Sequence, residues 1–237
     1  MGCTAVLLPG TGSDEVFIRS VFQAPLRAAD LELVAPGPVP GPDLVRHHLA
    51  ALDAAAQHGP VLVGGVSLGA HVAAEWACAH PTRCAGLLLA LPAWCGGAEG
   101  SPGAVAARLS AEAVRRDGVD ATLRAATAGV DPWLAAELDR AWRRHGHGLA
   151  DSLLAADRPA PTAAQLAALS VPAGLAAVVD DPVHPLPVAR QWAAALPHSA
   201  LRTLSFAEFG ADRTALGRAA VQAWQEAAAP LCHEGAP

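Results

Sequence analysis

A serine flanked by glycines, between an apolar strand and a helix of small residues, constrains this fold most. Gly65 and Gly69 lie two residues before and after the serine in the segment Pro60-Val-Leu-Val-Gly-Gly-Val-Ser67-Leu-Gly69-Ala-His-Val-Ala-Ala. A serine on a sharp turn needs neighbours without Cβ atoms, so that the chain can double back against the following helix. The pattern predicts that Ser67 projects from the carboxyl edge of a sheet, beside a helix N-terminus that favours developing negative charge. The simpler interpretation is that Ser67 only caps this helix.

Apolar strands alternate with amphipathic helices along the chain. We expect strands near residues 4–9, 31–35, 61–66, 85–91, 173–179 and 201–206. We expect core helices near residues 15–28, 43–57, 68–80, 188–196 and 214–228, and a helical stretch without strand signal over 102–169. Continuous apolar strands separated by helices are typical of a mostly parallel sheet covered on both faces, so the pattern predicts an α/β fold.

Composition excludes several classes of function. The net charge is −6 without a basic cluster, which argues against a nucleic-acid partner. No apolar run approaches the roughly 20 residues of a membrane span, and the N-terminal pattern is not that of a signal peptide, so we expect no membrane association and a cytoplasmic protein. The five cysteines lack metal-type spacing, which predicts reduced thiols and no metal site.

The chain contains no Lys, Asn or Tyr and a single Ile, which is typical of a bacterial gene with high G+C content. Any proton transfer must therefore use a histidine, a carboxylate, a thiol or water. Nothing in the sequence indicates a cofactor, and it leaves the oligomeric state open.

These motifs and their order resemble the α/β-hydrolase superfamily along nearly the whole chain, with Gly65-x-Ser67-x-Gly69 as its nucleophile elbow. The resemblance implies a three-layer α/β-hydrolase fold, with a core over residues 1–95 and 171–237 and a helical cap over 96–170. It also implies that Ser67 is the nucleophile. The segment Pro9-Gly10-Thr11-Gly12-Ser13 matches the family's His-Gly-x-Gly loop, so the backbone N–H groups of Thr11 and Leu68 would form the oxyanion hole.

The acid and the base are predicted from the loop after the fifth strand. Val179-Asp180-Asp181-Pro-Val-His184-Pro resembles the family's acid segment and places Asp181 at the acid position, with Asp180 as the neighbouring alternative. The family's histidine follows the last strand, where this chain has Ala211 instead. We expect His184 to be the base, since it lies beside the expected histidine loop. The alternatives are His71, the cap residues His145 and His147, and the carboxylates Glu208 and Asp212.

Several residues are candidates for contact with substrate. Besides Gly10, they are Trp94, which follows the fourth strand, His71, which lies one helical turn after Ser67, and Trp133 on a cap helix. Large aromatic side chains there favour a flat or apolar small molecule, although they could equally attach the cap to the core. The sequence therefore predicts a serine esterase or thioesterase that acts on a small hydrophobic acyl substrate. The alternative is a non-hydrolytic member of the superfamily, such as a cyclase, isomerase, lyase or ligand-binding protein of secondary metabolism.

Overall fold

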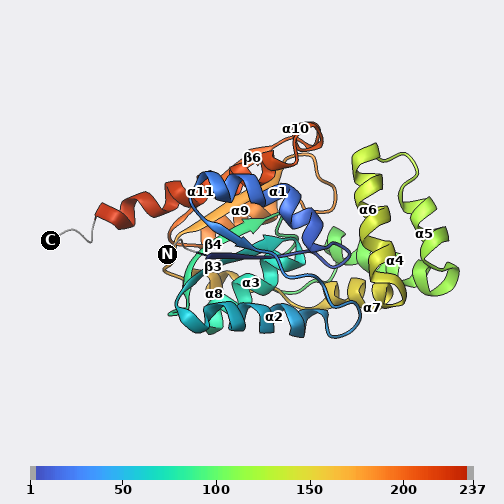
Figure 1. Ribbon diagram of the computed structural model, residues 1–237, viewed down its shortest axis with the longest axis horizontal. Coiled ribbons are helices and arrows are strands. Elements are labelled where there is room, and N and C mark those ends of the chain that lie inside the picture. The colour runs from blue at the N-terminus through green and yellow to red at the C-terminus, as the bar shows by residue number, and fades with distance from the viewer. Residues whose placement is uncertain (1–3, 234–237) are drawn as a thin grey trace.

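Six parallel strands form the centre of the computed structural model, which describes residues 4–233 (Figure 1). They are β1 (Thr4–Leu8), β2 (Glu32–Val34), β3 (Val61–Val66), β4 (Cys84–Ala90), β5 (Ala173–Val178) and β6 (Ser199–Leu204). Their order in the sheet is β2-β1-β3-β4-β5-β6, and every neighbouring pair is parallel. The central strands are buried on both faces, as their continuous apolar sequences predict. The predicted parallel α/β fold is confirmed.

Helices cover both faces of this sheet. On one face, α1 (Glu15–Ala28) and α11 (Thr214–His233) pack together against the strands, with core residues such as Phe22 and Leu216. On the other face lie α2 (Leu44–Ala55), α3 (Leu68–Ala79), α8 (Ala163–Ala167) and α9 (Leu186–Ala195), whose core includes Trp76 and Trp192. Two hydrophobic cores therefore hold the sheet between two layers of helices, with a short 3₁₀ helix η1 (Ala56–His58) after α2.

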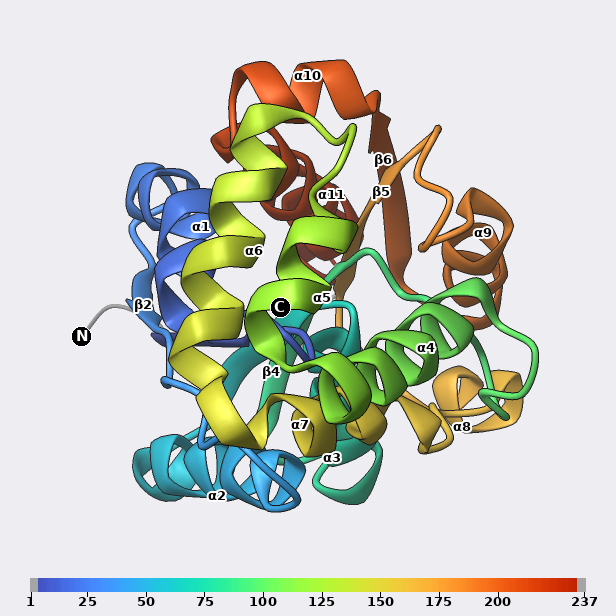
Figure 2. The same cartoon turned by 90° about the vertical axis from the view of Figure 1, so that its right-hand side faces the viewer.

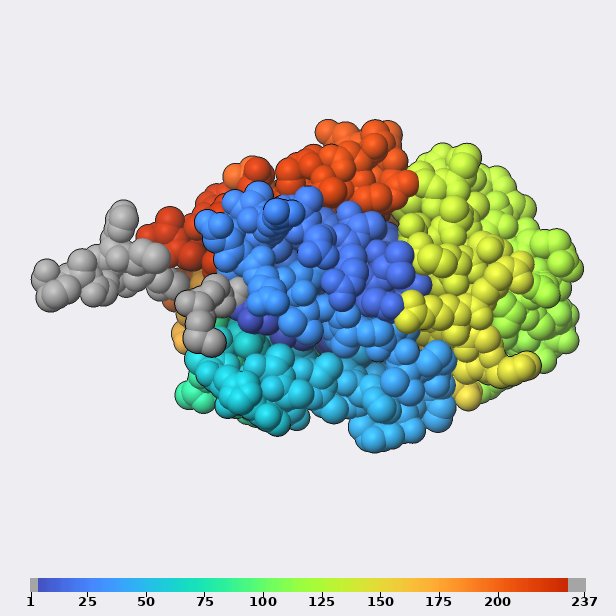
Figure 3. Space-filling model, viewed as in Figure 1, coloured from blue at the N-terminus to red at the C-terminus, as the bar shows by residue number. Residues whose placement is uncertain are grey.

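A helical cap lies beyond the sheet, at the end opposite the C-terminus (Figure 1). It contains α4 (Pro102–Asp117), α5 (Val119–Ala126), α6 (Pro132–His145) and α7 (Leu149–Leu154), with 3₁₀ turns η2 (Gly146–Gly148) and η3 (Ala155–Asp157). Seen from the cap, α6 runs from the side of α10 towards α2 (Figure 2). The cap has a small core of its own around Trp142 and Leu149. Its surface packs directly onto the N-terminal and C-terminal parts of the core (Figure 3).

One element differs from the expectation for the last strand. We expected it to continue to residue 206 and to lead into a loop, but β6 ends at Leu204 and a short helix α10 (Phe206–Ala211) follows. Ser205 caps this helix by accepting the N–H of Glu208, while the Glu208 carboxylate accepts the N–H of Ser205. This reciprocal capping box stabilises a helix start and explains why the strand stops.

None of the helices within residues 4–233 is both long enough and apolar enough to cross a membrane.

Candidate active site

Ser67 occupies a strained turn between β3 and α3. Its backbone angles are φ 56° and ψ −120°, a conformation that costs a non-glycine residue free energy. A Cβ atom at Gly65 would lie 2.2 Å from the carbonyl oxygen of Leu8, and one at Gly69 would lie 2.1 Å from the same oxygen. Both glycines are therefore required by the close approach of β1, and the turn presents Ser67 at the carboxyl edge of the sheet.

His184 lies beside this serine, with Asp181 behind it. The Nε2 atom of His184 is 3.0 Å from Oγ of Ser67, and its Nδ1 is 2.8 Å from Oδ2 of Asp181. Because a carboxylate only accepts, Nδ1 carries the proton and donates to Asp181, which leaves Nε2 free to accept from the serine hydroxyl. The three side chains form a continuous serine–histidine–carboxylate arrangement.

The loop after β5 makes this arrangement possible although acid and base are only three residues apart. Oδ1 of Asp181 accepts the backbone N–H groups of Val183 at 2.7 Å and His184 at 3.1 Å. One carboxylate oxygen thus closes the turn while the other holds the imidazole ring. Burial raises the pKa of Asp181, but the hydrogen bonds from His184 and the backbone outweigh it, and the pKa is lowered overall.

The predicted oxyanion loop borders the same space. Gly10 and Thr11 line a cavity together with Ser67 and Leu68, and a Cβ atom at Gly10 would lie 3.5 Å from that of Ser67. Among the hydrogen bonds of the described residues, none uses the N–H of Thr11 or of Leu68 as a donor. Two backbone donors that border the cavity are therefore without an internal partner among the described residues.

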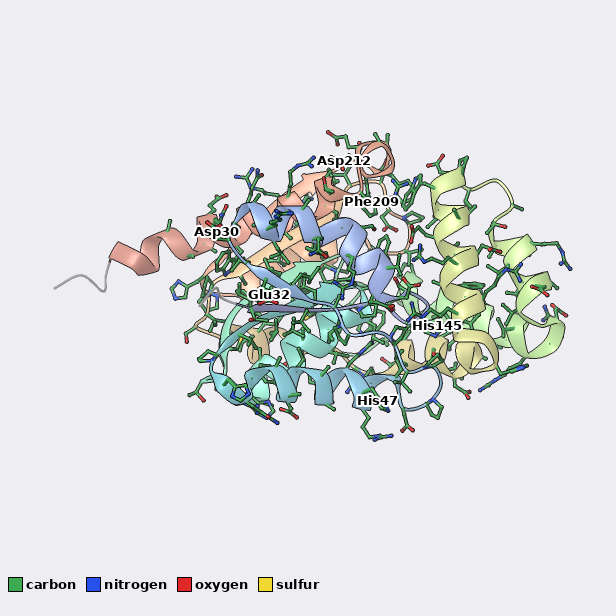
Figure 4. The ribbon with its side chains drawn as sticks, in the orientation of Figure 1. Asp30, Glu32, His47, His145, Phe209 and Asp212 are labelled. Atoms are coloured by element: carbon green, nitrogen blue, oxygen red, sulfur yellow. The ribbon has the colours of Figure 1, made fainter. Side chains whose placement is uncertain are left out.

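The cavity has a volume of about 750 Å³ and lies between core and cap. Trp94 and Trp133 both line it, as do Phe17, Phe206 and Phe209. Trp133 contacts Phe206 and Phe209 with ring centroids 5.4 and 5.2 Å apart, so α6 and α10 form one aromatic wall. Phe209 is marked beneath α10 in Figure 4. Such a volume and apolar lining are typical of small-molecule sites.

The other candidate bases have different partners. Glu208 caps α10, and Asp212 binds Thr214 and Arg218, which lowers its pKa to about 2. His145 is buried against Ser13, whereas His147 is exposed, and neither lines the cavity. Asp180 accepts the N–H of Phe206 at 2.7 Å, so it connects the loop after β5 to α10 and does not contact His184.

His71 lies outside the cavity wall. It is buried against Trp94 and Trp192, with ring centroids 4.4 and 5.4 Å away, and its Nε2 accepts the N–H of Ala93 at 3.0 Å. Burial lowers its pKa to about 3, which keeps the ring neutral. His71 therefore supports the loop that carries Trp94, and the structure does not bring it to the substrate space.

We expect the free energy of unfolding to fall as the pH is lowered from 7 to 5, because His48 and His71 are buried in their neutral forms. Burial lowers their pKa values from 6.5 to about 4 and about 3. The unfolded chain therefore binds more protons below about pH 6.5, and each histidine contributes about 2 kcal/mol to the loss at pH 5.

Urea unfolding at the two pH values measures this loss. A His48→Leu variant should show a smaller loss, while His58→Ala, at an exposed position, should behave as the unmodified protein. Equal stability at pH 7 and pH 5 would contradict the prediction.

Several residues of the site were not found from the sequence. The aromatic residues of α10 were assigned to a strand end and loop, although Ser205-x-x-Glu208 is a capping-box signal that indicates a helix start. Phe17 and Glu137 also line the cavity, and no sequence pattern indicates this, since it depends on how the cap docks. Within residues 4–233, no group of three or more His, Cys, Asp or Glu side chains is placed to hold a metal ion.

Comparison with known proteins relates this chain to others by its structure. No protein-family model matches the sequence, and neither does any curated protein. BpoC from Mycobacterium tuberculosis H37Rv has a similar structure, with a TM-score of 0.73, 17% identity and coverage of 96% of this chain and 93% of that one.

An esterase and a lactonase are also similar. A thermophilic esterase from Thermogutta terrifontis has a TM-score of 0.65 and 20% identity over 86% of this chain and 82% of its own. The enol-lactonase from Burkholderia xenovorans LB400 has a TM-score of 0.66 and 18% identity over 86% and 83%. At these identities the comparisons establish the architecture rather than the reaction. With its parallel six-stranded sheet, serine elbow and helical insertion, this chain has the α/β-hydrolase fold.

Proposed function

We propose that this protein is a serine hydrolase that cleaves esters or thioesters of uncharged, hydrophobic acyl groups through an acyl-Ser67 intermediate. The observation that carries the proposal is the 3.0 Å contact between Nε2 of His184 and Oγ of Ser67, with Asp181 held at the opposite ring nitrogen. A serine hydroxyl is a weak nucleophile unless a base is within hydrogen-bond reach, and this contact supplies one.

Proton transfer then follows from the geometry. Oγ of Ser67 attacks the acyl carbonyl carbon while His184 takes the serine proton at Nε2, and Asp181 stabilises the resulting imidazolium. His184 returns that proton to the leaving alcohol or thiol, which departs with the electrons of its bond to the acyl carbon. Water next gives a proton to His184 and attacks the acyl-enzyme, and His184 protonates Oγ as the carboxylic acid leaves. The N–H groups of Thr11 and Leu68 stabilise the oxyanion in both steps.

The charges around the cavity favour an uncharged substrate. Asp131, Glu137 and Asp180 line the cavity besides Asp181, and Glu137 pairs with Arg140, which does not itself line the cavity. The chain lacks lysine and no arginine is among the lining residues that the structure describes, so His184 is the one basic side chain among them. A carboxylate on the acyl chain would lose its hydration without gaining a cationic partner, which is costly in an apolar cavity.

The alternative is a protein that binds a ligand or catalyses a reaction other than hydrolysis. It would be favoured if Ser67 had no base within hydrogen-bond reach. A separation above about 6 Å between every histidine and Ser67 Oγ would have favoured it. The 3.0 Å contact instead supports acyl transfer.

Two measurements test the proposal. A fluorophosphonate probe should add its mass to the protein and should not modify Ser67→Ala, because the probe reacts with an activated serine. p-Nitrophenyl hexanoate should be hydrolysed with a kcat/KM about tenfold or more above that of the mono-p-nitrophenyl ester of adipic acid. The two acyl chains have equal length, but the second ends in a carboxylate.

The matched control for the charge effect is a pair of substitutions on α6. Asp131→Asn, at the N-terminal cap of α6, should reduce the ratio of kcat/KM between the two esters, whereas Asp139→Asn, which lies outside the cavity, should leave this ratio unchanged. Failure of both the probe and the esters to react would refute the proposed hydrolase activity. Equal kcat/KM values for the two esters would refute only the proposed preference for an uncharged acyl group.

A further inference from the structure

Three side chains of the cap helix α6 contact residues 12–14, which directly follow Thr11. The first contact is an ion pair between Arg140 and the fully buried carboxylate of Asp14. Nε of Arg140 lies 3.1 Å from Oδ2 and Nη2 lies 2.7 Å from Oδ1, which is a bidentate geometry. Oδ1 also accepts the N–H of Phe17 and so caps α1. Burial raises the pKa of Asp14, but these hydrogen bonds lower it overall, so the carboxylate is charged and paired.

The second contact is a buried chain of hydrogen bonds through His145, at the end of α6. Its Nε2 lies 2.9 Å from the carbonyl oxygen of Ser13, and its Nδ1 lies 3.1 Å from Oγ of Ser152. A carbonyl oxygen only accepts, so Nε2 carries the proton and Nδ1 accepts from the Ser152 hydroxyl. Oγ of Ser152 in turn accepts the N–H of Gly41 at 2.8 Å. Figure 4 shows His145 where the cap meets the segment that leads into α1.

The third contact is steric. A Cβ atom at Gly12 would lie 2.8 Å from Nε1 of Trp142, so the indole packs closely over the loop backbone. Residues 12, 13 and 14 are therefore each held by a side chain of one helix. The residue before them is Thr11, which has a glycine on both sides and would be conformationally free without such restraint.

We propose that Arg140 and His145 are positioning residues, which hold the N–H of Thr11 in the direction of the developing oxyanion. The inference rests on the proposed function. Neither residue lines the cavity, so neither acts by touching the substrate. Arg140 also pairs with Glu137, which does line the cavity, whereas His145 makes no such ion pair among the described residues, so His145→Leu is the cleaner test. In this arrangement α6 is part of the catalytic apparatus: it both forms the cavity wall and fixes the oxyanion loop. Displacing such a donor by about 1 Å costs up to about 100-fold in rate.

The test compares His145→Leu and Arg140→Met with Arg143→Met on the same helix. Arg143 is exposed and pairs with Asp120 and Asp139, away from the loop. For p-nitrophenyl hexanoate we expect kcat to fall about 10- to 100-fold in the first two variants with KM changed less than about threefold. The inhibition constant of phenylboronic acid, which forms a tetrahedral anion on Ser67, should rise by the same factor as kcat falls. Arg143→Met should match the unmodified protein in both measurements.

Two further measurements separate positioning from a loss of folding. Hydrogen exchange should accelerate in a peptide that covers residues 9–17 in His145→Leu, and should not change there in Arg143→Met. The conservative variants His145→Asn and Arg140→Lys keep a hydrogen-bond donor and should recover part of kcat. They also replace His145→Leu and Arg140→Met in the test if those two variants do not fold.

Specific outcomes overturn the inference. The first is a fall in kcat/KM that comes from KM alone. The second is an inhibition constant of phenylboronic acid that does not rise as kcat falls. The third is an unchanged hydrogen-exchange rate in residues 9–17. An unmodified protein without turnover would refute the proposed hydrolase, while the exchange experiment would still report whether α6 restrains the loop.

Discussion

Replacing His184 with alanine is expected to lower kcat/KM for p-nitrophenyl hexanoate by about 10⁴-fold or more. Nε2 of this ring is 3.0 Å from Oγ of Ser67, and the chain offers no lysine or tyrosine that could replace it as a base. Without the imidazole the serine keeps its proton at neutral pH and attacks poorly. The measurement is the initial rate of nitrophenolate release by purified protein at pH 7.5.

The matched control is His58→Ala, at an exposed position far from the cavity, which should leave the rate unchanged. Asp181→Asn should also reduce the rate strongly, because the amide cannot hold the imidazole in the tautomer that the carboxylate selects. If His184→Ala retained activity within a few-fold of the unmodified protein, another group would have to be the base.

A single methyl group at position 69 is expected to lower the free energy of unfolding by about 3 kcal/mol or more, or to prevent folding. In Gly69→Ala the new Cβ would lie 2.1 Å from the carbonyl oxygen of Leu8 and 2.8 Å from that of Pro9. Both atoms belong to the backbone where β1 leads into the oxyanion loop, so neither can move without disturbing the sheet and the site together. Urea unfolding followed by circular dichroism measures the change.

Gly97→Ala is the control for this substitution. The nearest atom to its Cβ is the free end of the exposed Glu99 side chain, which can rotate away. Its stability should remain within about 0.5 kcal/mol of the unmodified protein. A Gly69→Ala protein that is equally stable would mean that the turn has room for a side chain.

Much of the fold could be predicted because a parallel strand that is buried on both faces has a continuous apolar sequence. β3 starts and ends where its sequence predicts, and the other strands differ by one or two residues at their ends. The predicted end of β6 was wrong because Phe206 is apolar and therefore favours a strand. The capping box of Ser205 and Glu208 instead starts a helix at this position.

The candidate site was predictable where its parts lie on one short segment or one motif. Ser67 follows from the glycine pattern, and His184 follows from its closeness to Asp181. The pair of Asp14 and Arg140 could not be predicted, since 126 residues separate them and their contact depends on how α6 docks. Tertiary contacts of this kind leave no periodic pattern in the chain.

The turn that contains both Asp181 and His184 has a consequence for how this protein can change over evolutionary time. Because both groups come from the loop after β5, the chain after β6 has no part in the proposed proton relay. The segment that forms α10 does not supply a base, and its Phe206 and Phe209 border the cavity instead. Substitutions there can alter which molecules fit while the relay stays intact. The proposed relay and this aromatic part of the cavity wall are thus encoded in separate stretches of sequence.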